Sequence, residues 1–173
     1  MISVDVILAQ WARERPDLDV APMGVIGRLT RVNAAVESAL AADYARWGLD
    51  AGSFDVLFTL VRSGAPYALS PSSLTRSSMV SSAAVAQRLN RLVAAGLVAR
   101  GPDTKDGRGT IVTLTPEGKK LADRALPSHL ESEEQFLAPL NDQERTQLVG
   151  LLDRILRVRT DSDQEAIDSP STL

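Results

Sequence analysis

The stretch that decides the fold is residues 81–121, SSAAVAQRLNRLVAAGLVARGPDTKDGRGTIVTLTPEGKKL. Ser81 is placed to cap a helix that ends before Gly96, because serine hydroxyls accept from free amides and glycine tolerates the left-handed conformation after a helix. LVAR and TIVTLT follow as two predicted strands around the turn-forming residues PDTKDGRG. The stretch therefore predicts a helix followed by a β-hairpin with a basic tip.

This predicted helix has two distinct faces when its residues are placed at about 100° per residue. The apolar residues share the side expected to be buried, namely Val85, Leu89, Leu92 and Val93. Small and polar residues share the opposite side, namely Ala83, Ala84, Gln87 and Arg91. Arg88 and Asn90 lie on the flanks.

The residues upstream predict two more helices. Asp50 is placed to cap a mostly buried helix with Phe54, Leu57, Phe58 and Val61 on one face, and SGAPYALSPSS then supplies turn formers. Ser70 followed by Pro71 predicts the start of a short helix that is anchored in the core by Leu74. A short helix, a turn, a second helix and a basic hairpin make a winged helix-turn-helix, predicted over residues 50–115.

A winged helix-turn-helix predicts DNA binding, because a helix fits the major groove. Short residues at the helix start allow close approach, Gln87 and Arg91 have the reach to read base edges, and the wing tip suits phosphates or the minor groove. The predicted DNA-binding residues are Ser70, Arg76, Ser81, Ser82, Ala84, Gln87, Arg88, Arg91, Lys105 and Arg108. The alternative is that Gln87 and Arg91 are simply solvated.

Charge is distributed unevenly along the chain. Residues 70–108 carry a net charge of +4, although the whole chain carries -3. One basic segment in an otherwise acidic protein indicates a local contact with a polyanion, and double-stranded DNA is the expected partner.

Further helices are predicted on both sides of this domain. They comprise a short N-terminal helix over 1–16, which Ser3 can cap and which carries Trp11, and helices over 22–47 and 116–158. Pro127 is expected to kink the third segment, and Asn141 with Glu144 has the spacing of a capping box. Apolar residues occupy too many faces of the last helix for one packing partner, which indicates a homodimer. Residues 159–173 are acidic, small and polar, and we expect them to be disordered.

Composition excludes several classes of function. The 173 residues include no Cys and one His, so thiolate nucleophiles, cysteine-ligated zinc and paired imidazole ligands are excluded. His129 is expected to be a solvated surface residue. The sequence has no phosphate-binding glycine loop and no nucleophile with a base partner, so we expect neither an enzyme nor a cofactor. The first residues carry acids and no basic leader, and no apolar run is long enough for a membrane span, so we expect a cytoplasmic protein with no membrane partner.

The helix and hairpin residues resemble the MarR (multiple antibiotic resistance regulator) family. Its pattern has a Ser-rich helix start, RLxRLxxxGLVxR, a wing of D-x-x-D-x-R and then V-x-L-T-x-x-G, which this chain matches from Ser81 to Gly118. The resemblance implies that Asp103 and Asp106 brace the wing and that Arg108 lies near DNA. It also implies a mainly helical fold with a small β-hairpin wing, a homodimer joined through its N- and C-terminal helices, and a pseudopalindromic operator.

A finer resemblance begins at QWARERPDLD and continues through PMGVIGRLTR and GLDAGSFDVLFTLVRSGAPYALSP. These segments are similar to the PecS-like, urate-responsive subgroup, which adds an N-terminal helix to the common fold. The resemblance implies a small anionic, urate-like effector bound by Trp11, Asp55, Arg88 and Arg100. Other interpretations stay open: Trp11 as a docking side chain, Asp55 as a first-turn acid favoured by the helix dipole, and Arg100 as a phosphate ligand.

The expected function is therefore that of a transcriptional repressor released from its operator by such a ligand. The alternatives are a winged-helix protein with no small-molecule effector, or a winged helix used as a protein-interaction module.

Overall fold

The computed structural model describes residues 1–79, 82–102 and 109–168, and side chains are described for these residues except Ser82 and 158–168. The chain divides into two compact units between Glu133 and Glu134. No helix among the described residues has the length and apolar character to cross a membrane.

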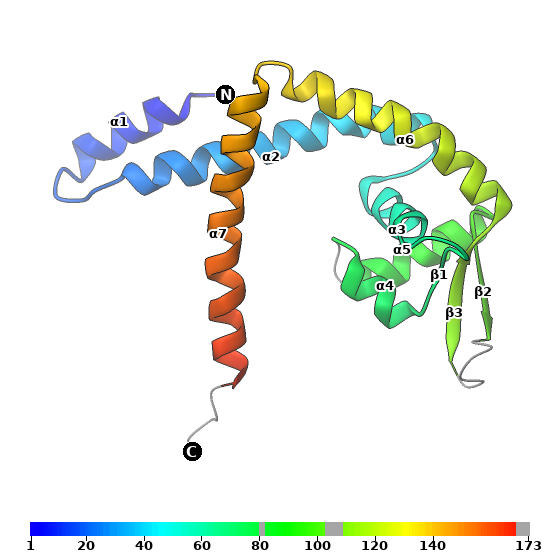
Figure 1. The fold of residues 1–173 in the computed structure, drawn as a ribbon. Coiled ribbons are helices and arrows are strands. Elements are labelled where there is room, and N and C mark those ends of the chain that lie inside the picture. The colour runs from blue at the N-terminus through cyan, green and yellow to red at the C-terminus, as the bar shows by residue number, and fades with distance from the viewer. Residues whose placement is uncertain (80–81, 103–108, 169–173) are drawn as a thin grey trace. The chain divides into compact units, whose positions relative to one another are not determined.

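The elements follow the order predicted for a winged helix-turn-helix with flanking helices (Figure 1). They are α1 (Val4–Glu14), α2 (Ala21–Arg46), α3 (Ala51–Arg62), β1 (Ala68–Leu69), α4 (Pro71–Ser77), α5 (Ser82–Ala94), β2 (Val98–Pro102), β3 (Thr110–Leu114), α6 (Pro116–Leu137) and α7 (Asp142–Asp168). The mainly helical fold class with a small β-sheet is confirmed.

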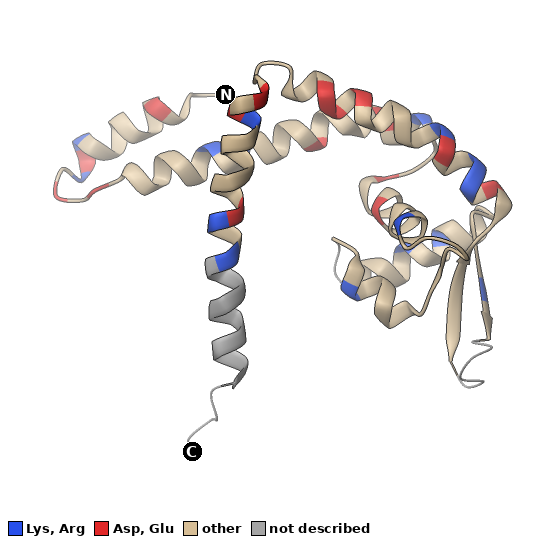
Figure 2. Ribbon diagram, in the orientation of Figure 1, with Lys and Arg blue, Asp and Glu red and all other residues tan. Residues whose placement is uncertain are grey.

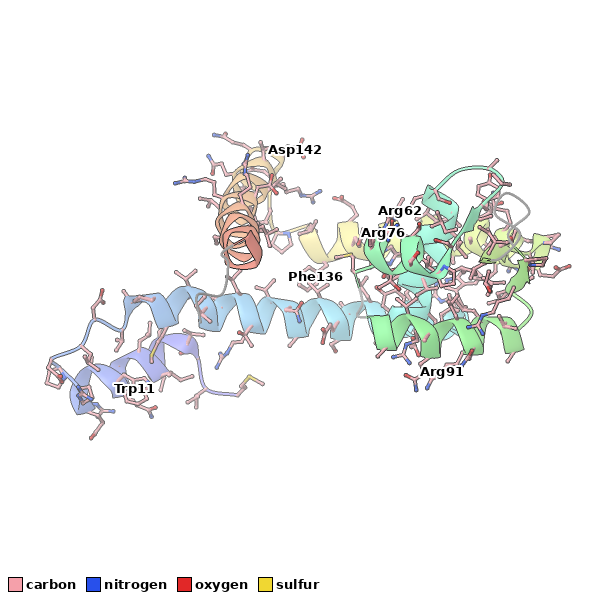
Figure 3. The ribbon with its side chains drawn as sticks, turned by 90° about the horizontal axis from the view of Figure 1, so that it is seen from below. Trp11, Arg62, Arg76, Arg91, Phe136 and Asp142 are labelled. Carbon is pink, nitrogen blue, oxygen red and sulfur yellow. The ribbon has the colours of Figure 1, made fainter. Side chains whose placement is uncertain are left out.

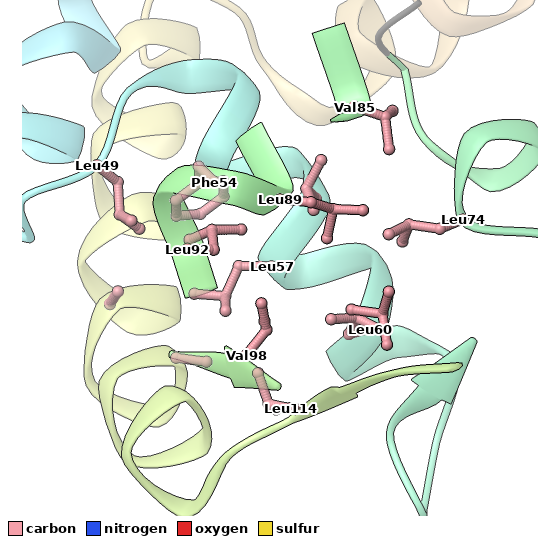
Figure 4. Close-up of a cluster of buried hydrophobic side chains, with 14 residues drawn as sticks. Leu49, Phe54, Leu57, Leu60, Leu74, Val85, Leu89, Leu92, Val98 and Leu114 are labelled. Atoms are coloured by element: carbon pink, nitrogen blue, oxygen red, sulfur yellow. The ribbon is translucent and has the colours of Figure 1, made fainter. Parts of the chain in front are cut away.

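Helix α3 lies at the centre of the hydrophobic core. Asp50 caps it by accepting a hydrogen bond from the Ser53 amide at 2.8 Å, as predicted. The cluster in Figure 4 combines fully buried leucines of α3 with side chains from α5 and β3; its members include Leu57, Leu60, Leu74, Val85, Leu89, Leu92, Val112 and Leu114. The prediction that Val93 is buried is wrong, since it is 37% exposed. Only the arc through Val85, Leu89 and Leu92 faces the core.

The wing belongs to a three-stranded antiparallel sheet with the order β1-β3-β2. The predicted hairpin pairs Val98 with Leu114 and Arg100 with Val112. Strand β1 pairs Ala68 with Thr113 and has no counterpart among the predicted elements, because its two residues lie within a segment of turn formers. The added strand ties the turn before α4 to the wing.

The base of the wing interlocks with the start of α6. Thr115 accepts from the Gly118 amide through its hydroxyl at 3.0 Å, and the same hydroxyl donates to the Gly96 carbonyl at 2.7 Å. The Thr115 amide donates to the Leu97 carbonyl. A Cβ placed on Gly118 would lie 2.0 Å from that carbonyl oxygen, so only glycine permits this close approach. Gly96 itself has φ +72°, as its predicted place after a helix requires.

Helices α1 and α2 form an antiparallel pair in the first unit. Ser3 caps α1 as predicted, by accepting from the Val6 amide at 3.2 Å. Two glycines of α2 allow the helices to approach closely, because Gly27 faces Val4 and Gly24 faces Leu8. Asp5 and Arg28 add an ion pair at 2.5 Å.

The expectation that His129 is solvated is wrong. Its side chain is 12% exposed, and its ring lies 4.4 Å from the Phe54 ring and 5.6 Å from the Tyr44 ring, measured between centroids. The Nε2 atom lies 3.1 Å from Glu133. His129 therefore helps to pack α6 against α2 and α3.

In the second unit, the predicted capping box begins α7. The Glu144 amide donates to Asn141 Oδ1 at 3.0 Å, and the Asn141 amide donates to Glu144 Oε2 at 2.9 Å. Helix α7 continues to Asp168, so the expected disorder is wrong for residues 159–168. This stretch contains no Gly or Pro to stop the helix, although its polarity resembles that of a disordered segment. Residues 169–173 lie outside the described residues.

Gly118→Ala should destabilise the protein by about 1–3 kcal/mol, because overpacking against a backbone carbonyl forces α6 away from the wing. Chemical denaturation followed by circular dichroism at fixed protein concentration measures this change. Gly150→Ala is the matched control, since a Cβ there meets no atom within 4 Å. Equal stability of the two variants would contradict the interlock.

Candidate nucleic-acid interface

The first helix of the helix-turn-helix begins with a network of serine hydroxyls. Ser70 caps α4 by accepting from the Ser73 amide at 3.2 Å and lies 3.0 Å from the hydroxyls of Ser72 and Ser73. Arg76 is exposed and donates to the Ser73 hydroxyl at 3.1 Å. The Ser70 hydroxyl thus holds the helix start in place, whereas the Arg76 guanidinium remains accessible to a phosphate.

Two polar residues of α3 hold the end of α4 and the segment that follows it. Asp55 Oδ2 accepts a hydrogen bond from the Met79 amide at 2.8 Å. At the other end of α3, the Arg62 guanidinium donates to the Ser77 carbonyl and to the Thr59 hydroxyl. Asp55, predicted as an effector ligand, thus acts in this structure as a brace for the chain after α4.

Helix α5 presents the predicted outward residues to solvent. Gln87 and Arg91 are exposed, and Ala84 is half-buried. Ser82 is the first residue of α5, and Ser81, its predicted cap, lies outside the described residues. The side chain of Gln87 is thus accessible for readout at base edges.

Both arginines of α5 converge on Asp50 at the start of α3. Arg91 Nη1 donates to Asp50 Oδ2 at 2.8 Å, and Arg88 Nε lies 3.1 Å from Oδ1 without hydrogen-bond alignment. Arg88 also donates to Gln87 Oε1 at 3.2 Å. Gly52 leaves room for this arrangement, because a Cβ there would lie 2.7 Å from Arg88 Nε. The Arg91 side chain is exposed, and an ion pair of this kind contributes about 0.2–1 kcal/mol.

The pKa of Asp50 lies below its usual value. Burial by itself raises this pKa, but hydrogen bonds from the backbone and side chain of Ser53 and the charges of Arg88 and Arg91 outweigh that effect. Since the folded state lowers the pKa, the ionised carboxylate stabilises the fold above the unfolded-state pKa of about 3.9. This contribution is lost as the pH falls through the lowered value.

The wing is described as far as Pro102 on β2 and from Gly109 before β3. Arg100 is exposed on β2. The predicted wing residues Asp103, Lys105, Asp106 and Arg108 lie outside the described residues, so their bracing and DNA-contact roles stay predictions.

A cavity of about 450 Å³ lies among α4, α5 and the sheet. Its lining includes Ser72 and Thr75 from α4, Val85 and Leu89 from α5, and Arg100 and Thr110 from the strands. One cation and several hydroxyls around an apolar floor suit an anionic ligand with an apolar body.

The four predicted effector residues do not assemble into one site within the chain. Arg88 pairs with Asp50, Asp55 with the Met79 amide, and Arg100 lines the cavity. Trp11 lies at the opposite end of the first unit from Arg76 and Arg91 (Figure 3). The reason is the length of α2: α1 packs near Gly24 and α3 packs near Tyr44, about 30 Å apart at 1.5 Å per residue.

The helix-turn-helix and the first strand of the wing carry only positive charge on their own residues. Residues 71–102 include four arginines and no acid, and Figure 2 shows blue segments without red on α4 and β2. The acids that reach this region among the described residues come from the start of α3, namely Asp50 and Asp55.

The order of elements, the exposed polar face of α5 and this basic surface define a winged helix-turn-helix regulator of the DNA-binding class. The profile described as the MarR family matches residues 47–109. The transcriptional regulator PecS of Dickeya dadantii is 42% identical over 154 residues, which cover 89% of this chain and 93% of PecS. The chain belongs to the MarR family.

Solved structures agree with this assignment. Bordetella bronchiseptica BpsR, whose DNA binding is regulated by 6-hydroxynicotinic acid, matches with a TM-score of 0.67 and 28% identity over 76% of this chain and 97% of that one. A mutant of Escherichia coli MarR, complexed with operator DNA, matches with a TM-score of 0.70 and 25% identity over 80% and 99% of the chains. These relatives are transcriptional regulators, so the expectation that the protein is not an enzyme is confirmed.

The sequence predicts Asp50 as a helix cap but does not predict its pairing with the two arginines. A helix cap at Asp50 is a local signal and is predictable. The contact of Asp50 with Arg91 spans 41 positions in sequence and depends on how α3 crosses α5. The glycine two residues after the cap is the one available signal, since a small residue in a first turn leaves space for a neighbouring side chain.

Asp50→Ala should lower the free energy of unfolding at pH 7 by about 1–2 kcal/mol, because it removes the cap. Asp50→Asn keeps the cap, so its free energy of unfolding should fall by less. The difference in free energy of unfolding between Asp50→Asn and the unsubstituted protein should become smaller below about pH 4, where the carboxylate becomes protonated. Denaturation of the three proteins from pH 3 to pH 7 measures both effects. A difference that does not change with pH would contradict the stabilising role of the ionised carboxylate.

Proposed function

We propose that this regulator is a sequence-specific repressor that binds a pseudopalindromic operator as a homodimer and is released by a small anionic aromatic ligand. The observation that carries the DNA-binding part is the acid-free, arginine-bearing segment 71–102 folded as a winged helix-turn-helix. In this proposal Gln87 reads a base edge, while Arg76 and Ser70 lie near phosphates with Lys105 and Arg108 of the wing.

The homodimer is supported by apolar side chains that the single chain leaves exposed on its flanking helices. On α1 and α2 they include Val6, Trp11, Met23, Ile26 and Val32, and on α6 and α7 they include Leu126, Leu130, Val149, Leu151 and Ile155. A second copy would remove these surfaces from water. Two chains would also place two α5 helices on two half-sites, which accounts for a pseudopalindromic operator.

The effector is proposed to bind in the cavity beside Arg100. A carboxylate or urate-like anion would pair with the guanidinium, while its ring would lie against Val85 and Leu89. The regulation of BpsR by 6-hydroxynicotinic acid supports an aromatic anion as the chemical class. A ligand wedged between α4, α5 and the wing would shift α5 relative to its copy, and a small shift prevents both half-sites from docking together.

Gln87→Ala should weaken binding to the selected operator by about 1–3 kcal/mol and change binding to random DNA little, because a base contact carries sequence information. The operator is first selected from a random duplex pool, and affinities are measured by fluorescence anisotropy at two salt concentrations. Gln143→Ala, at the start of α7, is the matched control. Failure of the unsubstituted protein to select any sequence would instead favour the protein-interaction module.

Arg100→Ala should raise the ligand concentration needed for half-release of the operator about tenfold or more, because the charged partner of the anion is gone. The probes are urate, other anionic purines and aromatic carboxylates, each titrated into the protein–operator complex, with Arg13→Ala on α1 as the control.

Trp11→Ala, measured in parallel, locates the site. An unchanged response would leave the ligand in the cavity, whereas a lost response would require Trp11 from a second chain. Release by none of the probes would favour a regulator with no small-molecule effector.

A further inference from the structure

Asp50 introduces a carboxylate into the basic surface that is proposed to contact DNA. It caps α3 and reaches both arginines of α5, at 2.8 Å for Arg91 and 3.1 Å for Arg88. Among the described residues it is the acid that forms ion pairs with α5. A negative charge at this place opposes binding to phosphates, which calls for an explanation beyond helix capping.

The two carboxylate oxygens of Asp50 have different roles. Oδ1 accepts from the Ser53 amide at 2.8 Å, which fixes the side chain at the start of α3. Oδ2 is then directed to Arg91 Nη1. A cap alone needs one oxygen and no charge, since asparagine and serine cap helices as well as aspartate does. The second oxygen and the charge are therefore available to restrain arginine.

Arg88 and Arg91 differ in how easily they could leave Asp50. Arg88 is 24% exposed, and its side chain lies over Gly52, in space that a Cβ would fill. Arg91 is 56% exposed and lies on the outward face of α5 with Gln87. Arg91 is therefore the arginine that would be free to contact a DNA phosphate if Asp50 carried no charge.

We propose that Asp50 is a specificity-determining residue of the proposed DNA interface, because it withholds Arg91 from DNA phosphates. A free guanidinium on α5 can reach a phosphate in any register on random DNA, whereas base contacts at the operator hold α5 in one register and leave fewer phosphates within its reach. Held by Asp50, Arg91 adds little to binding at random sites, so the ratio of operator affinity to random-site affinity is larger. This inference rests on the proposed repressor function.

Asp50→Asn tests the restraint because it keeps the cap and removes the charge. At about 50 mM salt, affinity for a random duplex should rise about tenfold, and the slope of log K against log salt should steepen by about two for a two-chain protein, at about 0.9 per phosphate contact. Affinity for the selected operator should rise less. Asp50→Ser, which also caps helices but is too short to reach Arg91, should give the same result if folding is intact by circular dichroism.

A double-variant cycle separates the release of Arg91 from the loss of a negative charge. Arg91→Ala should reduce random-DNA affinity at least about fivefold more in the Asp50→Asn background than in the unsubstituted protein. If the Asp50→Asn, Arg91→Ala double variant keeps the full gain in random-DNA affinity, the gain comes from the lost repulsion between the Asp50 carboxylate and DNA. That result would overturn the proposal. Asp19→Asn, a matched loss of charge just before α2, should change neither affinity nor slope.

The outcomes also separate this inference from the function on which it rests. If the unsubstituted protein binds no duplex, the repressor proposal fails and the inference fails with it. If the unsubstituted protein selects an operator but Asp50→Asn shows the same affinity and salt slope, the inference alone fails.

Discussion

The packing of α3 is the constraint on which the rest of the winged-helix domain depends. Val56, Leu57 and Leu60 are fully buried, and α2, α4, α5 and β3 all contact this helix. A helix buried on most sides has room for polar side chains chiefly at its ends. Asp50 and Asp55 near its start and Arg62 in its last turn hold the surrounding elements by hydrogen bonds and ion pairs. Helix α3 therefore helps to set the position of α5 through both its apolar sides and its polar ends.

Local signals in the sequence predict most of the fold. Helix caps at Ser3, Asp50 and Ser70, and the capping box at Asn141, involve residues within three positions of each other, so the chain encodes them without its tertiary structure. Gly96 is predictable for the same reason, because a positive φ after a helix is a local requirement. These signals determine the order of helices and the place of the hairpin, which together define the fold class.

Features that depend on distant contacts could not be predicted. His129 has no run of apolar neighbours in sequence, and it is half-buried because α6 crosses the rings of Tyr44 and Phe54. Strand β1 exists because β3 offers a free edge to two residues of a turn. The predicted effector residues are spread along the chain for a related reason. Trp11 lies on α1, which packs near Gly24 of the 26-residue α2, whereas Asp55 lies on α3, which packs near Tyr44.

The arrangement around Asp50 bears on how a basic surface can remain selective. Phosphate contacts raise affinity for every sequence, and the relevant quantity for a regulator is the ratio of operator binding to binding at the many competing sites. A chain with four arginines and no acid over residues 71–102 would bind strongly but indiscriminately if all four were free. Asp50 occupies two of them from outside this segment, at a position where it also begins α3. In the proposed interface, stability and selectivity are thus coupled through one side chain, because the carboxylate that caps the central helix also neutralises charge on α5.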